Sequence, residues 1–180
     1  MAILRLAKFV VISNVILQVS AQGRIEEYQV KAAFLYNLAK FVEWPAQSFH
    51  IPTSPIVICI LGHDPFGRAL TEMLEGKVLD GRALVVQQIS DAQKAGNCHV
   101  VFVGSSEQKR FRSILQDLKA TGALTVGDTE GFAAQGGVVN LKLEGGMVRF
   151  EINLEAGKEK NLRISSKLLS LAQIVKTRGI

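Results

Sequence analysis

The sequence has few of the residues from which redox and metal centres are built. It contains two cysteines, Cys59 and Cys98, which do not form a C-x-x-C motif, so a thioredoxin-like redox enzyme is excluded. Its three histidines, His50, His63 and His99, have no metal-ligand spacing and no neighbouring cysteine or carboxylate pattern. We therefore expect no metal site in this chain.

The sequence also lacks the motifs of nucleotide and nucleic-acid binding. The formal charge is +5, but the positive residues are scattered and do not form the stripe that is typical of a nucleic-acid binder. Gly62 and Gly67 have the spacing of half a P-loop, but Arg68 and Ala69 stand where that loop requires Lys and Ser or Thr. We expect neither a nucleic-acid partner nor a bound cofactor.

No apolar run reaches the length that spans a bilayer, which is about 20 residues. Residues 1–21 instead have the pattern of a signal peptide, because Arg5 and Lys8 give a positive start. The apolar segment Phe9–Val19 follows, and Val19-Ser20-Ala21 is a small-residue cleavage site. An uncleaved membrane anchor is the alternative, but the segment is short and interrupted by polar residues. We expect cleavage after Ala21 and export of a single domain, residues 22–180.

Two apolar segments, Pro55–Leu61 and Val100–Val103, show no polar alternation and are typical of strands buried on both faces. The first leads into a helix from Phe66 to about Glu75, with Asp64 as its cap, and the second into a helix from about Glu107 to Lys119. Buried strands that each feed a helix indicate a parallel sheet covered on both faces.

The remaining pattern extends this sheet. It predicts strands at Leu84–Ile89 and Leu124–Val126, and a hairpin of Val138–Leu143 and Met147–Leu154 around Gly145-Gly146. A helical turn ending at Asn161 follows. A last helix is capped by Ser165 or Ser166, and its inward residues are Leu168, Leu171, Ala172 and Val175. The predicted fold class is α/β: an open mixed sheet with parallel central strands, helices on both faces and a C-terminal antiparallel hairpin.

The clearest helix pattern extends from Glu26 to Trp44, where Pro45 ends it. The spacing predicts an apolar face of Val30, Phe34, Leu38 and Phe41, with Lys31 on the polar side. Trp44 is interpreted as a packing anchor, with an aromatic hot spot for a partner as the alternative.

Three short loops follow the predicted parallel strands, and ligands of open α/β sheets bind at such strand ends. They are Gly62-His63-Asp64, Gly104-Ser105-Ser106 and Gly127-Asp128-Thr129. The second loop resembles a nucleophile elbow but lacks its last glycine, and helix capping accounts for Ser105 or Ser106. No active site is recognisable, so the chain is not expected to be an enzyme.

In an oxidising compartment, two cysteines beside adjacent strands are expected to form a disulfide rather than remain buried free thiols. A Cys59–Cys98 bridge closes a loop of about 40 residues and should contribute roughly 3–4 kcal/mol.

Six segments of the sequence resemble the YfiR-like family of bacterial periplasmic proteins. They are Glu27–Pro45, Leu61–Phe66, Leu124–Asp128, Gly136–Asn140, Arg149–Leu154 and Ile164–Leu169. The resemblance implies two disulfides in some members. Cys59 and Cys98 match one pair, whereas Ala133 and Asn140 lie near the places of the second pair, which argues against redox control through it.

The resemblance also implies a function and partners. A YfiR-like protein represses a membrane-bound diguanylate cyclase, lowers cyclic di-GMP and biofilm formation, and is sequestered by an outer-membrane lipoprotein. The oligomeric state stays undecided, and a homodimer is one alternative. The alternatives are a periplasmic sensory or solute-binding module linked to a histidine kinase, and an unrecognised hydrolase that uses the three strand-end loops.

The signal peptide can be tested by intact mass. We expect the product in a periplasmic extract to lack residues 1–21, because the charged start and short apolar segment direct export and cleavage. A mass that still contains Met1, or a product retained in the inner membrane, would contradict this prediction.

Overall fold

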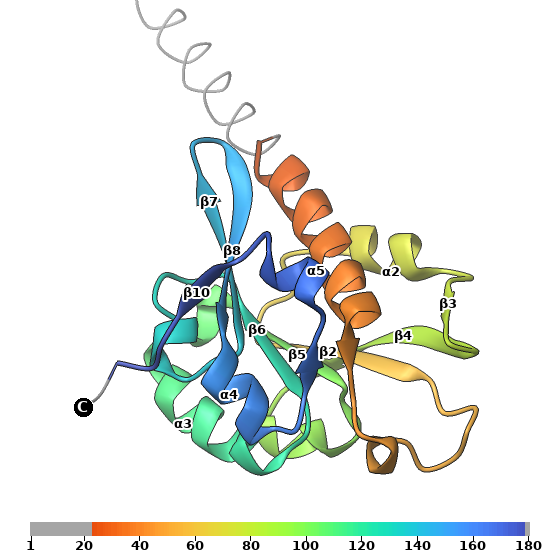
Figure 1. Ribbon diagram of the computed structural model, residues 1–180. Helices are drawn as coiled ribbons and strands as arrows, with labels where there is room; N and C mark the ends of the chain where they lie inside the picture. Colours follow the sequence, from red (N-terminus) through yellow and green to blue (C-terminus); the bar gives the residue numbers. More distant parts are fainter. Residues whose placement is uncertain (1–22, 179–180) are drawn as a thin grey trace, which may run out of the picture.

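A sheet of eight strands runs through the part of the chain that the computed structural model describes, residues 23–178 (Figure 1). The expected signal peptide lies outside the described residues. The spatial order of the strands is β10-β8-β7-β6-β5-β2-β4-β3. In chain order they are β2 (Ile56–Leu61), β3 (Val78–Leu79), β4 (Arg82–Ile89), β5 (Val100–Val103), β6 (Leu124–Gly127), β7 (Val139–Glu144), β8 (Met147–Asn153) and β10 (Gln173–Val175).

The centre of the sheet is parallel, as the two unbroken apolar segments predicted. Strands β4, β2, β5, β6 and β7 pair in parallel, in that order. Antiparallel pairing occurs at β7–β8 and at β3–β4, while β10 adds to β8 in parallel. The predicted mixed α/β class is therefore confirmed.

Helices cover both faces of the sheet. They are the N-terminal helix (residues 23–41), α2 (Arg68–Leu74), α3 (Phe111–Asp117), α4 (Leu154–Glu159) and α5 (Ser166–Leu169), with 3-10 turns η1 (Ala46–Ser48), η2 (Ala92–Asn97), η3 (Ser105–Arg110), η4 (Leu118–Ala120) and η5 (Ala133–Gln135). No helix within residues 23–178 is both long and apolar enough to cross a membrane.

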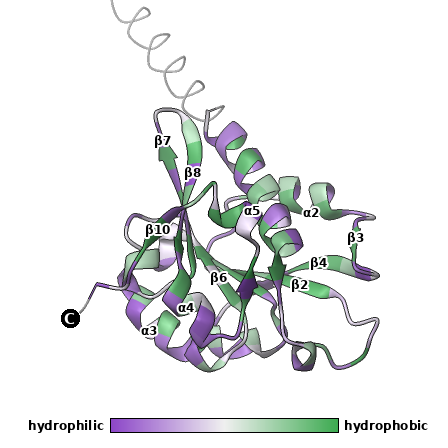
Figure 2. Ribbon diagram, viewed as in Figure 1, coloured by the Kyte–Doolittle hydropathy of each residue, from purple (hydrophilic) through white to green (hydrophobic). Residues whose placement is uncertain are grey.

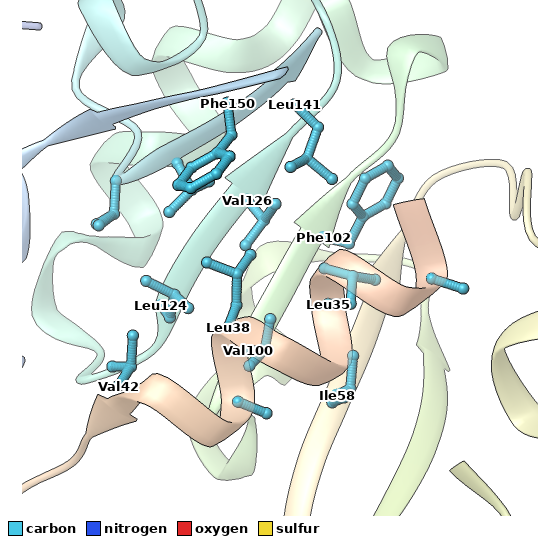
Figure 3. Close-up of a cluster of buried hydrophobic side chains, with 14 of the residues drawn as sticks. Leu35, Leu38, Val42, Ile58, Val100, Phe102, Leu124, Val126, Leu141 and Phe150 are labelled. Carbon is cyan, nitrogen blue, oxygen red and sulfur yellow. The ribbon is translucent and has the colours of Figure 1, made fainter. Parts of the chain in front are cut away.

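Two hydrophobic layers follow from the alternation of side chains along the central strands. Ile58, Val100 and Val126 point to the layer beneath the N-terminal helix, where Leu35 and Leu38 of that helix meet them (Figure 3). The neighbouring residues of the same strands point to the opposite layer, beneath η2 and α3. Figure 2 shows the resulting pattern, with hydrophobic strands at the centre of the molecule.

The N-terminal helix is rotated and ends three residues earlier than predicted. It ends at residue 41, and Val42–Glu43 instead forms β1, which pairs with β9 (Arg163–Ile164). The expected inward residue Val30 is 46% exposed, whereas the expected outward residue Lys31 is 2% exposed. The real inner face is Tyr28, Lys31, Ala32, Leu35, Leu38 and Ala39, which has the same helical spacing with a lysine inside it.

The predicted hairpin is present. Gly145 and Gly146 have φ values of 57° and 77°, the left-handed region that both central residues of a tight type I′ turn require. This turn lets β7 and β8 project together beyond the rest of the sheet (Figure 1).

The predicted last helix is wrong beyond its first turn. Ser165 caps α5, since its Oγ accepts from the N–H of Lys167 at 3.3 Å, but the helix ends at Leu169. Leu171, expected inward, is 75% exposed. The following residues form β10, because the free edge of β8 offers backbone partners for Gln173–Val175.

A disulfide joins Cys59 of β2 to Cys98, which directly precedes the neighbouring β5. The two Cα atoms are 5.8 Å apart and the bridge lies in the hydrophobic layer beneath η2 and α3. It therefore links two neighbouring central strands at their buried side.

We expect reduction of this bridge to lower the free energy of unfolding by about 2–4 kcal/mol, because the unfolded chain regains the entropy of an open loop. Urea unfolding of oxidised and reduced wild-type protein measures the difference. The Cys59→Ala/Cys98→Ala variant is the control, since it should resemble the reduced protein and ignore reductant. Free thiols in protein freshly isolated without reductant would contradict the assignment.

Candidate functional site

The loops at the carboxyl ends of β2 and β5 are tied to each other. The N–H of Gly104 donates to the carbonyl of Leu61 at 2.9 Å, and the N–H of His63 donates to Ser106 Oγ at 2.9 Å. The predicted capping role of the serines is wrong, because Gly104 is the N-cap of η3 and no side chain caps it. Ser106 holds two loops together instead.

Aromatic side chains pack together near the place where the strand order reverses, between β2 and β5. Asp64 Oδ1 accepts from the N–H of Phe66 at 2.8 Å. Its predicted role as the helix cap is wrong, because α2 begins at Arg68, its N-cap is Gly67 and no side chain caps it. The Phe66 ring then packs against Phe102 and Tyr28, with centroid distances of 4.8 Å and 5.5 Å. Ligands of open α/β sheets commonly bind at this switch point.

A buried ion-pair network joins the N-terminal helix to the third loop. The side chains of Lys31 and Asp128 are 3% and 2% exposed, and Lys31 Nζ lies 3.1 Å from Asp128 Oδ2. Tyr28 donates its hydroxyl proton to the same oxygen at 2.6 Å, and Glu27 pairs with Lys31 from one helical turn before it. Burial, followed by the Asp128 carboxylate, raises the pKa of Tyr28 above its ordinary value, so the hydroxyl stays a donor.

The sequence reasoning missed Lys31 although two signals could have identified it. Glu27 and Lys31 have the i, i+4 spacing of a helical ion pair. Lys31 also lies three residues after Tyr28 and four before Leu35, so the inner face of the helix can include it. A buried lysine needs a carboxylate partner, and only the fold supplies Asp128.

A cavity of about 600 Å³ lies at the opposite, amino edge of the sheet. Trp44, His99 and Lys160 line it together with Cys98 of the disulfide. Trp44 donates its indole N–H to the His99 carbonyl at 3.0 Å and meets the imidazole edge-on, in agreement with its interpretation as a packing anchor.

Lys160 lies immediately after α4 and is 8% exposed. Its Nζ donates to the carbonyls of Leu118 and Thr121, at the end of the α3–η4 helical segment. Burial lowers the pKa of Lys160 to about 8. This geometry suits a side chain that caps a helix end, where carbonyls lack partners and a cation is favoured.

A groove opens between the start of the N-terminal helix and the hairpin tip, where the two elements lie side by side (Figure 1). Deeper in the layer, Phe34 packs against Phe150 with ring centroids 5.4 Å apart. The groove has a volume of about 820 Å³, and the charged residues Arg24, Glu26 and Glu27 form one part of its lining. The lining also includes Val30, Leu143 and Met147. These three side chains are 46%, 54% and 55% exposed.

Within residues 23–178, no cluster of three or more His, Cys, Asp or Glu side chains could hold a metal ion. His50 and His63 are exposed and contact different parts of the fold. His50 Nε2 lies near Asn97, whereas the backbone N–H of His63 donates to Ser106 and so joins the strand-end loops. Among the described residues, the groove beside the hairpin and the cavity beside Trp44 lie at opposite ends of the first helix.

The described residues form an α/β domain with an open, mixed sheet and a groove between its N-terminal helix and its hairpin. The sequence model of the YfiR/HmsC-like family matches residues 28–173. The chain therefore belongs to this family, in agreement with the resemblance found in the sequence.

The similar solved structures are distant. The chain is 13% identical to a conserved domain protein from Vibrio cholerae, covering 67% of this chain and 54% of that one with a TM-score of 0.49. It is 10% identical to the ABC domain in complex with L-Trp from Streptococcus pneumoniae, covering 67% and 55% with a TM-score of 0.47. The chain spans about half the length of these structures. No curated protein matches it.

The buried ion pair can be tested by unfolding. We expect Lys31→Met to lower the free energy of unfolding by about 3–5 kcal/mol, because it leaves the buried Asp128 carboxylate without its cation. Adding Asp128→Asn should recover part of this loss. The matched control is Arg68→Ala, which breaks the exposed Arg68–Glu72 pair and should cost less than about 1 kcal/mol. If Lys31→Met and Arg68→Ala lowered the free energy of unfolding equally, the Lys31–Asp128 pair would not fix the helix.

Proposed function

We propose that this chain is an exported regulator that binds the periplasmic part of a membrane diguanylate cyclase and keeps the enzyme inactive. The result is lower cyclic di-GMP and less biofilm. The observation that carries the proposal is membership of the YfiR/HmsC-like family over residues 28–173. The Cys59–Cys98 disulfide supports the export part of it, because disulfides persist in oxidising compartments.

Repression across a membrane needs differential binding. A domain outside the membrane silences the cyclase only if it binds the inactive conformation more tightly than the active one. Moving the cyclase from mostly active to mostly inactive requires a difference of roughly 5 kcal/mol. An interface of that strength is expected to contain buried apolar anchors.

The groove between the N-terminal helix and the hairpin offers such anchors. Val30, Leu143 and Met147 are large apolar side chains that the fold leaves about half exposed around one concave surface. We place the cyclase contact there. An outer-membrane lipoprotein that covers the same groove would sequester the chain and relieve repression.

The cavity beside Trp44 favours a second candidate, a sensory or solute-binding module linked to a histidine kinase. Its volume of about 600 Å³ is adequate for a small molecule. A thermal-shift screen separates the candidates, since a ligand at 100 times its dissociation constant stabilises the folded state by about 2.7 kcal/mol. A ligand that acts on a kinase output and leaves cyclic di-GMP unchanged favours the second candidate.

Deletion of the gene should raise cyclic di-GMP and matrix production, and a copy that lacks residues 1–21 should fail to restore repression. Substitution of the groove residues, Val30→Asp with Met147→Asp, should also abolish repression while the protein stays folded, because both side chains are exposed. The matched control is Val78→Asp on β3, since Val78 is 59% exposed at the far edge of the sheet.

Two results would contradict the proposal. Full complementation by the copy without residues 1–21 would exclude action from the periplasm. Unchanged cyclic di-GMP after deletion would exclude the cyclase as the output. Full repression by the groove variant would leave the function intact but move the contact to another surface.

A further inference from the structure

The outer edge of β4 has no strand beside it over most of its length. On its inner side β4 pairs with β2 from Leu84 to Ile89. On its outer side β3, the last strand of the sheet, covers only Arg82 and Ala83 (Figure 1). Within residues 23–178, no other strand pairs with β4. The second half of this strand is therefore a free sheet edge.

One hydrogen bond identifies the free backbone groups of this edge. The N–H of Leu84 faces outward, because it donates at 3.4 Å to the carbonyl of Lys77, which directly precedes β3. Along a strand, the backbone groups of every second residue face the same side. The N–H and C=O groups of Val86 and Gln88 therefore also face outward, beyond the end of β3.

The free edge lacks the features that usually prevent strands from pairing between molecules, which are charged side chains, proline and bulges. Residues 83–89 contain no charged residue and no proline, and their register with β2 is regular. Val85, within this segment, is an apolar side chain that is 39% exposed. At the other end of the sheet β10 is only three residues long, and Lys176 and Arg178 follow it. The edge of β4 is thus the one that is suited to a further strand.

Two shallow hollows lie along the free edge and carry charges of opposite sign. The hollow beside the first half of β4 has a volume of about 500 Å³ and is lined by Glu72 and Glu75. Arg68 also lines it but pairs with Glu72, so this hollow is negative overall. The hollow beside the end of β4 has a volume of about 570 Å³, and Lys94 is the charged residue in its lining. A strand with the opposite order of charges would complement this edge.

We propose that the free edge of β4 pairs with the same edge of a second copy of this chain. The two strands run antiparallel about a two-fold axis, so that two sheets join into one. With Val86 opposite Gln88 of the second copy, the outward groups of both residues are paired in each copy, and the axis passes beside Gln87. The inference does not depend on the proposed function.

The charges favour a second copy as the occupant of this edge. Antiparallel pairing sets the first half of one β4 beside the end of the other. The negative hollow that contains Glu75 in one copy therefore lies beside Lys94 of the second copy, and the same contact is repeated across the axis. The uncharged segment 83–89 places no like charges between the two strands.

The test is sedimentation equilibrium of the oxidised mature chain over a wide range of concentration. We expect a monomer–dimer equilibrium, and the dimer should weaken as salt is added, because the contacts of Glu75 with Lys94 are screened. Hydrogen exchange at residue resolution locates the surface. The amide protons of Val86 and Gln88 should exchange slowly in the dimer and rapidly at concentrations where the monomer dominates.

Substitutions at the edge assign the contact. Gln87→Lys places two lysines opposite each other at the axis and should raise the dissociation constant of the dimer at least about tenfold. The matched control is Gln116→Lys on the exposed surface of α3, which should leave dimerisation unchanged. Glu75→Lys and Lys94→Glu should each weaken the dimer, and the double variant should recover it, because the two charges are exchanged across the axis.

Three results overturn the proposal. The first is a chain that stays monomeric at every concentration, which would leave the edge to a strand of another protein. The second is a dimer in which Val86 and Gln88 exchange as rapidly as in the monomer, since the contact would then lie elsewhere. The third is a dimer that Gln87→Lys does not weaken. If Gln87→Lys fails to fold, hydrogen exchange of the wild-type protein decides.

Discussion

The ion pair between Lys31 and Asp128 sets the rotation of the N-terminal helix on the sheet. The ammonium group is buried and must reach the carboxylate at the end of β6, because an unpaired charge in this layer would be costly. With Lys31 inside, Leu35 and Leu38 point onto the central strands (Figure 3). The same rotation turns Val30 outward, where it lines the groove beside the hairpin. One polar contact thus decides both the buried and the exposed apolar faces of the helix.

The two edges of the parallel sheet have different roles. At the carboxyl edge, Phe66 and Ser106 close the loops where other α/β domains bind ligands. At the amino edge, a cavity remains beside Trp44, and its wall is a segment without sheet pairing.

The groove beside the hairpin and the amino-edge cavity lie at opposite ends of the first helix. The helix rises roughly 16 Å between Val30 and its end at residue 41, at about 1.5 Å per residue.

The sequence by itself determined the parallel central strands, the Gly145-Gly146 hairpin and the family, because unbroken apolar runs, turn glycines and family motifs are local signals. Reasoning from the sequence placed Lys31 on the outer face and Val30 on the inner face of the first helix, and both placements were wrong. It also extended the first helix to Trp44 and continued the last helix through Leu171. In each case a distant partner decided the outcome: Asp128 for Lys31, β9 for the end of the first helix, and the edge of β8 for the last residues. The contacts of His99 with Ser48 and Val57 likewise depend on three segments that only the folded sheet brings together. Local patterns reveal which elements form, but pairing of buried polar groups and of free strand edges is satisfied only in the tertiary structure.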